Sequence, residues 1–301
     1  MAADQKIKII QYTDPLCTWC YGMEPAMRKI EYLLGDKVEI VTILGMLIGD
    51  VRDIIGRDEH ADARFIQFKE QMSQGIKKAA NRTGVPIDFE AVDKLGMNDI
   101  TSVPMCLAYK AMHIQNREAS EKFLRRMREA RYAEGRTLVT VDDLAQLAAE
   151  FPVDLERFKK DMTDGTAEEL YSADLITSSQ HQVRTYPTYN VTYGKAEKSA
   201  TGYSEFAFFK SAIAELTDGE IVLETPEYSL DAAVKFVSTY GKVMVREIQV
   251  LFDLTDEQLA ACVDDLLAMG TFEKVDGGSS YFVKAKPLSF CNPATGECLA
   301  L

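Results

Sequence analysis

Two cysteines separated by two residues, Cys17 and Cys20, are the part of this sequence best suited to chemistry. They follow an apolar alternating segment, 7–12, that predicts a strand, and they begin a helical pattern that continues past Met27. The unpaired N–H groups and the positive dipole end at a helix start stabilise an anion. We therefore expect the pKa of Cys17 to fall, which favours the thiolate that acts as nucleophile in disulfide exchange.

The same spacing also occurs in zinc sites and in pairs of structural cysteines. A zinc site usually needs a second pair of ligands, and the sequence holds no second C-x-x-C and no H-x-x-H. Cys20 follows Cys17 by about one helical turn and can attack a mixed disulfide formed at Cys17. The strand-then-helix context favours the redox interpretation, so we expect a dithiol site that requires no metal or organic cofactor.

Composition and charge restrict the classes of function. The chain has 301 residues, enough for roughly two domains, and its hydrophobic content of 47% and charged content of 27% are typical of a soluble globular protein. The formal net charge of -13 argues against binding to nucleic acid or to anionic membranes, since both need clustered Lys and Arg.

No segment has the apolar length of a signal peptide or a membrane span. Six cysteines are too few for a disulfide-stapled secreted scaffold. We expect a cytoplasmic protein.

The secondary-structure pattern of residues 1–222 predicts one α/β domain with a large helical insertion. A β-branched run, 38–44, predicts a strand after the first helix and hence a right-handed β-α-β crossover. Residues 53–182 are almost wholly helical in pattern, and strands return at 188–193 and 198–201. The helices predicted within the insertion are 61–83, 88–95, 103–117, 120–134, 141–150 and 154–181.

Pro187 is a second candidate site residue, because it lies at the entry to the predicted strand 188–193. Proline is tolerated there because the missing N–H costs least at a strand end. An X-Pro bond entering a strand beside a redox site is a candidate for the cis isomer, although most X-Pro bonds are trans. The sequence leaves the isomer of the Tyr186-Pro187 bond open.

These features together resemble the DsbA family of the thioredoxin superfamily, in particular its FrnE-like branch. The C-x-x-C at a strand-to-helix junction, the helical insertion and the block Val183-Arg184-Thr185-Tyr186-Pro187-Thr188 carry the resemblance, which covers about residues 6–218. It implies a thioredoxin-like fold in which Cys17 is the nucleophile, Cys20 resolves the mixed disulfide, and a cis Pro187 lies against both.

The resemblance also implies a role for Glu24 in proton transfer from Cys20. A carboxylate about one turn after Cys20 can accept the proton that this thiol must lose. The alternative is a solvated helix residue that precedes Pro25.

The residues around the cysteines depart from the family's better-known members. Thr18-Trp19 stands between the cysteines in place of the Pro-His of the best-known oxidant or the Gly-Pro of the reductant. No histidine is present there to stabilise the thiolate, so we expect a less extreme oxidant. Tyr186, which follows Thr185 and precedes the proline, is bulky, and we expect it to narrow the groove for extended substrate backbone.

Residues 223–286 predict a second, small domain. After the break at Thr225-Pro226, the order of helix, short strand, two helices and hairpin resembles a winged helix-turn-helix. Its third helix, 256–269, has four acidic residues and no Lys or Arg, so DNA phosphates would repel it. We expect this domain to contact proteins or to form a homodimer.

The tail, 287–301, holds a second cysteine pair, Cys291 and Cys298, with Pro293 and Gly296 between them. These residues favour a turn that could bring the two sulfurs together. The hypothesis is that this pair accepts electrons from Cys17 and Cys20, or guards them when it is oxidised. The alternative is two incidental thiols in a mobile chain end.

Other reactive residues are given a structural interpretation. Cys106 and Cys262 lie in apolar helical patterns and are expected to be small buried side chains. The charged run 122–131 is expected to be a solvated helix face. The three histidines are scattered, so the sequence supports neither a Cys-His couple nor a metal cluster.

The sequence therefore predicts a thiol-disulfide oxidoreductase of reductase or isomerase type. Its expected partners are protein or peptide disulfides and a thiol system that resets the pair. The alternative is a DsbA-like cytoplasmic adaptor or redox-sensing binding protein. A glutathione-dependent isomerase is less favoured, because that branch replaces the first cysteine with serine and Cys17 is intact.

Overall fold

The central sheet has four strands in the order β2-β1-β3-β4. The computed structural model describes residues 6–287, 289–291 and 298–300. The first two strands pair in parallel and the other pairings are antiparallel, with Ile9 opposite both Ile40 and Val191. The strands are β1 (Ile7–Thr13), β2 (Val38–Leu44), β3 (Thr188–Tyr193) and β4 (Ala196–Thr201). The predicted strand-helix-strand opening and the returning strand pair are confirmed.

Two helices, α2 (Glu24–Leu34) and α11 (Phe206–Leu216), pack their apolar sides on the sheet. Ile7, Ile9 and Val191 of the sheet and Ile30 of α2 have no exposed surface in this cluster. Burial of several such side chains, at about 1.5–3 kcal/mol each, is the main force that holds this layer together. The strand that ends at the cysteines is therefore anchored at its middle.

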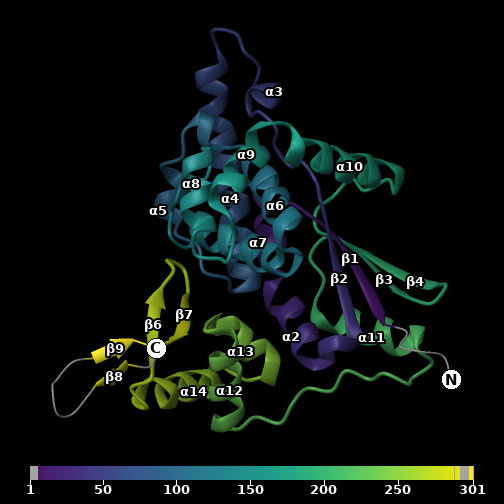
Figure 1. The fold of residues 1–301 in the computed structure, drawn as a ribbon, viewed down its shortest axis with the longest axis vertical. Helices are drawn as coiled ribbons and strands as arrows, with labels where there is room; N and C mark the ends of the chain where they lie inside the picture. The colour runs from purple at the N-terminus through teal and green to yellow at the C-terminus, as the bar shows by residue number, and fades with distance from the viewer. Residues whose placement is uncertain (1–5, 288, 292–297, 301) are drawn as a thin grey trace.

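A block of helices, residues 52–180 and here called the helical block, lies between β2 and β3 in the sequence. Figure 1 shows it at one end of the sheet, with α3 and the start of α4 rising to a tip. No helix in the described ranges is long and apolar enough to cross a membrane. The helices of the helical block are α3 (Arg52–Ile55), α4 (Ala61–Thr83), α5 (Phe89–Asp93), α6 (Val103–Gln115), α7 (Arg117–Tyr132), α8 (Val141–Ala148), α9 (Leu155–Thr163) and α10 (Thr166–Gln180).

Two helix predictions in this block were wrong at their ends. The predicted single helix 154–181 is two helices, because Gly165 adopts a φ of 94° that ends the first helix and turns the chain. Helix α7 begins at Arg117 rather than residue 120, because the Asn116 side chain accepts a hydrogen bond from the Ala119 N–H and caps it there.

The C-terminal unit, residues 230–285, contains the predicted helix, short strand, two helices and hairpin. Its strands form a separate sheet in the order β5-β7-β6, around buried residues that include Phe236, Ile248 and Leu266. Its elements are α12 (Leu230–Tyr240), β5 (Lys242–Met244), α13 (Val245–Phe252), α14 (Asp256–Ala268), β6 (Phe272–Asp276) and β7 (Tyr281–Ala285). The first helix begins where the Ser229 side chain caps it.

The C-terminal unit is joined to the helical block by the tip of its β6–β7 hairpin, which points at the block in Figure 1. The Ser279 N–H donates to the Ile87 carbonyl at 2.8 Å, and the Ile87 N–H donates to Ser279 Oγ at 3.0 Å. Phe282 and Met244 of the unit are part of the buried core of the helical block. The hairpin tip, which a DNA-binding winged helix would use, is therefore covered by the chain's own residues.

The tail contains a two-stranded sheet formed by β8 (Ser289–Cys291) and β9 (Cys298–Ala300). These strands are antiparallel, and their register places Cys291 directly opposite Cys298. Residues 292–297 between them lie outside the described part of the chain. A redox role for this pair stays a prediction.

The hairpin contact makes Gly278 sensitive to substitution. Its φ is 81°, and an added Cβ would lie 2.4 Å from the Ile87 carbonyl oxygen and 2.6 Å from Asp88 Cα. Gly270 has a similar φ of 72°, with no atom within 4 Å of an added Cβ. We expect Gly270→Ala to cost about 1–2 kcal/mol of unfolding free energy in urea, from the positive φ alone. Gly278→Ala should cost about 1–3 kcal/mol more, because the hairpin must withdraw. If the two variants lost equal amounts of unfolding free energy, this would contradict the packing of the β6–β7 hairpin tip against Ile87.

Candidate active site

Cys17 is the residue that caps α1 (Thr18–Tyr21), a single turn that follows the end of β1. The Cys17 sulfur accepts a hydrogen bond from the Cys20 N–H at 3.2 Å. The predicted continuous helix from the cysteines through Met27 is wrong, because α1 ends at Tyr21, with Gly22 as its C-cap, and α2 begins separately at Glu24. The two thiols therefore sit on a short, isolated turn.

The 186–187 peptide comes from the far side of the sequence to meet this turn. The Tyr186-Pro187 bond is cis, which decides the isomer that the sequence left open. The Cys17 thiol donates to the Tyr186 carbonyl oxygen at 3.5 Å. The structure thus brings together three of the predicted site residues, Cys17, Cys20 and Pro187.

The pKa of Cys17 is raised, contrary to the prediction. The hydrogen bond with the Cys20 sulfur, burial, and the charges of Cys20 and Asp14 all oppose its ionisation, and the Cys20 N–H only partly compensates. The physical reason is that Cys17 is 4% exposed and that α1 has four residues. Burial penalises a charge, and so short a helix has a small dipole.

The Cys20 sulfur is the more favourable place for a negative charge in this arrangement. Burial raises its pKa, but the hydrogen bond from Cys17, the charge of Arg128 and the Thr13 hydroxyl outweigh burial, so the pKa of Cys20 is lowered. Two thiols that interact this strongly share one charge and titrate as a pair. The charge of Arg128 favours ionisation on the Cys20 side of this pair.

Arg128 is a site residue that the sequence interpretation missed. It lies on α7, in the charged run 122–131 that was expected to be solvated, yet it is 3% exposed. Its guanidinium donates to Glu24 Oε1 at 2.5 Å and to Thr13 Oγ1 at 2.6 Å. Sequence signals for this position were weak, because a buried arginine and a solvated one look alike on a charged helix.

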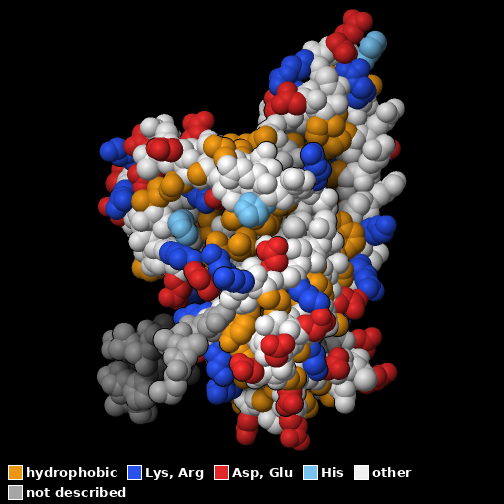
Figure 2. Space-filling model, turned by 90° about the vertical axis from the view of Figure 1, so that its right-hand side faces the viewer, with side chains coloured by type: hydrophobic (Ala, Val, Ile, Leu, Met, Phe, Trp, Pro, Cys, Tyr) orange, Lys and Arg blue, Asp and Glu red, His pale blue; other side chains and the backbone are white. Residues whose placement is uncertain are grey.

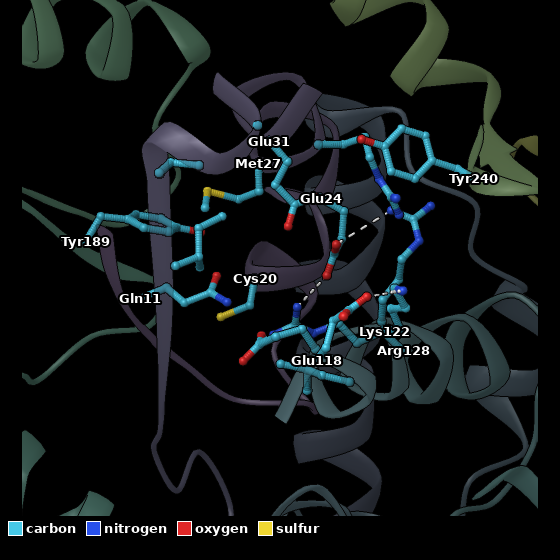
Figure 3. A pocket seen from close by; sticks show the side chains of 17 residues that line it. Gln11, Cys20, Glu24, Met27, Glu31, Glu118, Lys122, Arg128, Tyr189 and Tyr240 are labelled. Carbon is cyan, nitrogen blue, oxygen red and sulfur yellow. Dashed lines mark hydrogen bonds and ion pairs between the residues drawn. The ribbon is translucent and has the colours of Figure 1, made fainter. Parts of the chain in front are cut away.

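Glu24 is an ion-pair partner in the structure. Its carboxylate binds Arg128, and its second oxygen lies 3.6 Å from Arg125 Nη1. Figure 3 shows Glu24 projecting into the same cavity as Cys20 and Arg128. Its predicted part in proton transfer from Cys20 stays a prediction.

Asp14, which the sequence analysis did not single out, is a buried part of the site. It is 0% exposed, and its two oxygens accept from the Leu16 and Leu47 N–H groups at 2.7 Å each. Burial raises the pKa of Asp14 to about 6, against those two hydrogen bonds, a further one from Ser102 and the charge of Arg128. Asp14 thereby ties the loop before Cys17 to the chain just after β2.

Two cavities flank the cysteines and differ in character. The cavity on the Cys20 side has about 400 Å³ and a charged lining that includes Arg28 and Arg128. Tyr240 of the C-terminal unit also lines it (Figure 3), and the Arg28 guanidinium lies over the Tyr240 ring at 3.9 Å. The cavity on the Cys17 side has about 200 Å³ and a mostly apolar lining that includes Leu47 and Ile76. The site therefore has a polar back and an apolar entrance.

The predicted tuning residues take different places around the entrance. Thr18 and Trp19 line the apolar cavity, while the Tyr186 ring lies against Gly45, where an added Cβ would be 2.0 Å from it. Tyr186 is not among the residues that line this cavity, and its predicted narrowing of the groove for substrate backbone stays a prediction. Thr185 is exposed, and its carbonyl accepts from the Thr188 hydroxyl.

The apolar lining continues onto the surface near the tip of the helical block. Figure 2 shows apolar side chains on the flank of that tip, while acidic side chains crowd the lower end of the same face. Several large apolar side chains in this stretch are at least 44% exposed, namely Met46, Leu47, Ile54 and Ile66. Among the described residues, no group of three or more His, Cys, Asp or Glu is arranged to hold a metal ion.

Comparison with known proteins agrees with this geometry. A family model described as thioredoxin matches residues 11–209. The chain belongs to the thioredoxin family. It has the DsbA form of that fold, with helices inserted between the sheet's strands, so the predicted resemblance and fold class are confirmed.

Two solved structures share the fold over about two thirds of the chain. A candidate protein disulfide isomerase from Nitrosomonas europaea is 19% identical, with a TM-score of 0.57, over 71% of this chain and 97% of that one. The cytosolic disulfide reductase DsbM from Pseudomonas aeruginosa is also 19% identical, with a TM-score of 0.52, over 64% of this chain and 88% of its own.

A longer match is found with the ClpXP adapter protein SpxH of Bacillus subtilis. It is 23% identical over 283 residues, which cover 93% of this chain and 89% of that protein. Since the match leaves few residues of this chain uncovered, it includes most of the C-terminal unit. The sequence match thus extends over the sheet, the helical block and most of the C-terminal unit.

The titration of Asp14 makes stability depend on pH. Its pKa is raised from 3.8 to about 6, so the folded protein binds this proton more tightly than the unfolded chain does. The resulting stabilisation is complete below pH 3.8 and is lost as the pH rises through about 6. We expect the unfolding free energy of the wild type, relative to Asp14→Asn, to fall by at most about 3 kcal/mol between about pH 4 and about pH 7.

Asp50→Asn is a suitable control for this measurement. A hydrogen bond from the Arg52 N–H lowers the pKa of Asp50. The unfolding free energy of the wild type, relative to Asp50→Asn, should therefore rise with pH. A wild-type curve parallel to that of Asp14→Asn over this range would contradict the raised pKa of Asp14.

Proposed function

We propose that this protein is a thiol-disulfide oxidoreductase that acts on protein or peptide disulfides. The observation that carries the proposal is the placement of Cys17, which is hydrogen-bonded both to the Cys20 N–H and to the Tyr186 carbonyl beside Pro187. Cys17 also lines the apolar cavity at the entrance. Membership of the thioredoxin family supports the same chemistry.

The exchange begins with a proton shift within the pair. Cys17 gives its thiol proton to the Cys20 thiolate as its sulfur attacks one sulfur of the substrate disulfide. The substrate S–S bond breaks, a Cys17–substrate disulfide forms, and the released substrate sulfur takes a proton from solvent. Cys20 thus serves first as the base for Cys17, in keeping with the lowered pKa of Cys20.

Cys20 completes the cycle by attacking the mixed disulfide. Its thiol loses its proton, its sulfur bonds to the Cys17 sulfur, and the second substrate sulfur leaves and takes a proton. Two electrons have then passed from the dithiol to the substrate, and a Cys17–Cys20 disulfide remains. A small-molecule or protein dithiol restores the pair. No metal or organic cofactor takes part in these steps.

Protein substrates suit the entrance better than small polar disulfides do. A cavity of about 200 Å³ beside Cys17 accommodates a large apolar side chain next to the substrate cysteine, and the exposed Leu47 extends this apolar surface. Burial of apolar side chains would contribute to binding in proportion to the area removed from water.

We further propose a cytoplasmic location and a role in reduction or isomerisation, because a reducing compartment keeps the dithiol form populated. Nucleic acid is not an expected partner. The hairpin tip of the C-terminal unit contacts Ile87, and α14 carries acidic residues in its first turn. Homodimer formation through the C-terminal unit stays a prediction.

A second candidate function is that of an adaptor that binds a client protein. The observation in its favour is that the ClpXP adapter of Bacillus subtilis matches 93% of this chain, whereas DsbM matches 64%. Under this function the C-terminal unit helps to hold the client, and the cysteines respond to the redox state. Binding would then not require turnover at Cys17.

Insulin reduction in the presence of dithiothreitol tests the proposal. We expect Cys17→Ala to reduce the rate to the uncatalysed background, because the attacking sulfur is gone. Cys20→Ala should accumulate a mixed disulfide with the substrate, visible on a non-reducing gel, because nothing resolves it. Cys262→Ala, which removes a buried thiol from the C-terminal unit, should retain the wild-type rate.

A different pattern would favour the adaptor. An inactive wild type that forms a stable complex with a client, and still forms it as Cys17→Ala, would contradict the oxidoreductase.

A further inference from the structure

Glu247, on α13 of the C-terminal unit, is buried among arginines of the rest of the chain. Its side chain has 0% exposure and accepts from Arg125 Nη1 at 2.5 Å and Nη2 at 2.7 Å. Arg28 of α2 adds a third contact at 3.3 Å, and the Met244 N–H a fourth at 2.7 Å. A buried carboxylate with this many partners is held in one position.

The charges continue from Glu247 to the thiols. Arg125 bonds to Glu129 at 3.0 Å and lies 3.6 Å from Glu24. Glu24 in turn binds Arg128 at 2.5 Å, and the charge of Arg128 acts on Cys20. Carboxylates and guanidinium groups therefore alternate from the C-terminal unit to the Cys20 sulfur.

The position of the Arg128 guanidinium depends on few bonds. Its Nε is buried and has no hydrogen-bond partner within the described ranges. Glu24 and Thr13 therefore hold it, with the Asp14 carbonyl at 3.5 Å. Any change in how Glu24 divides itself between Arg125 and Arg128 alters the field at Cys20, and screening by solvent is weak at this depth.

We propose that Glu247 is a positioning residue for the redox site. Glu247 binds Arg125, so Arg125 does not compete with Arg128 for Glu24. In this way Glu247 sets how far Arg128 stabilises the Cys20 thiolate. The effect of Glu247 on disulfide exchange rests on the proposed oxidoreductase function. The coupling between Glu247 and the ionisation of Cys20 is a property of the thiol pair and does not. The reactivity of the cysteines then depends on the docked C-terminal unit.

The ionisation of Cys20 is also affected by charges and polar groups from every element around it. These neighbours are Thr13 at the end of β1, Asp14 after it, Cys17 at the start of α1, Glu24 on α2 in the same cavity, Arg128 and Tyr132 on α7, Tyr186 before β3 and Tyr189 on β3. A substitution at Glu247 replaces none of these residues, and in the proposal it acts on Cys20 through two of them, Glu24 and Arg128. A shift caused by that substitution therefore reports the link through Arg125.

Glu247→Gln tests the link with little change in shape. The amide keeps an oxygen for the Met244 N–H but loses the charge, so Arg125 turns to Glu24 and releases Arg128 toward Cys20. We expect the ultraviolet absorbance of the thiolate to appear at lower pH. We also expect the equilibrium with a glutathione buffer to shift toward the dithiol by about threefold or more.

Glu150→Gln is the matched control. Glu150 also accepts from an arginine of α7, Arg126, at 2.7 Å, but its side chain is 45% exposed. This variant should leave both the thiolate titration and the glutathione equilibrium at the wild-type values. A thermal melt of each variant checks that the protein remains folded.

Arg28→Gln separates the proposal from simple loosening of the interface. This substitution removes one of the two arginines that contact Glu247. Glu247 then binds Arg125 more strongly and draws it away from Glu24, so Glu24 binds Arg128 more firmly. The thiolate should then appear at higher pH than in the wild type. Curves for Glu247→Gln that superimpose on the wild type, or shifts in the same direction for both variants, would overturn the proposal.

These readouts also keep the two proposals apart. The titration and the glutathione equilibrium measure the thiol pair itself, without any protein substrate. If insulin reduction fails while the opposite shifts are observed, the oxidoreductase proposal falls and the coupling stands. If insulin reduction succeeds without the shifts, the coupling falls.

Discussion

The structure depends on the need to pair the charges that α7 carries into the interior. Three of its arginines are less than 9% exposed, Arg125, Arg128 and Arg131, and a buried charge without a partner costs several kcal/mol. Arg128 finds its partner on α2, Arg125 finds one on α13, and Arg131 donates to the Asp99 carbonyl at 2.8 Å. One helix thereby fixes the sheet domain, the helical block and the C-terminal unit against one another.

The same pairing shapes the chemistry of the cysteines. A thiolate in a thioredoxin-like site is commonly attributed to a helix start, but α1 is a single turn and Cys17 is buried. Arg128 supplies the positive charge, and it does so from the side of Cys20. The apolar cavity lies beside Cys17, on the other face of the pair, so under the proposed function different groups serve ionisation and substrate binding.

The C-terminal unit contributes to the site in a way that its order of elements did not indicate. Winged-helix patterns suggest a module that works on its own surface. Here the β6–β7 hairpin contacts Ile87 and Glu247 reaches Arg125. A unit that is held by buried ion pairs has a fixed relation to the cysteines, which suits both a tuned oxidoreductase and an adaptor that senses its own redox state.

The sequence by itself determined the elements and the identity of the reacting groups, because local patterns are enough for those. The strands 38–44 and 188–193, the helix 61–83 and the dithiol Cys17-x-x-Cys20 were all predictable from alternation, helical periodicity and spacing. Tertiary structure decided which charged residues are buried. Nothing local distinguishes Arg128 from Arg126, yet one faces Cys20 and the other pairs with Glu134 and Glu150 near the surface. The raised pKa of Cys17 follows from its hydrogen bond with Cys20 and from its burial in the folded site, which is why the expected direction for Cys17 was wrong.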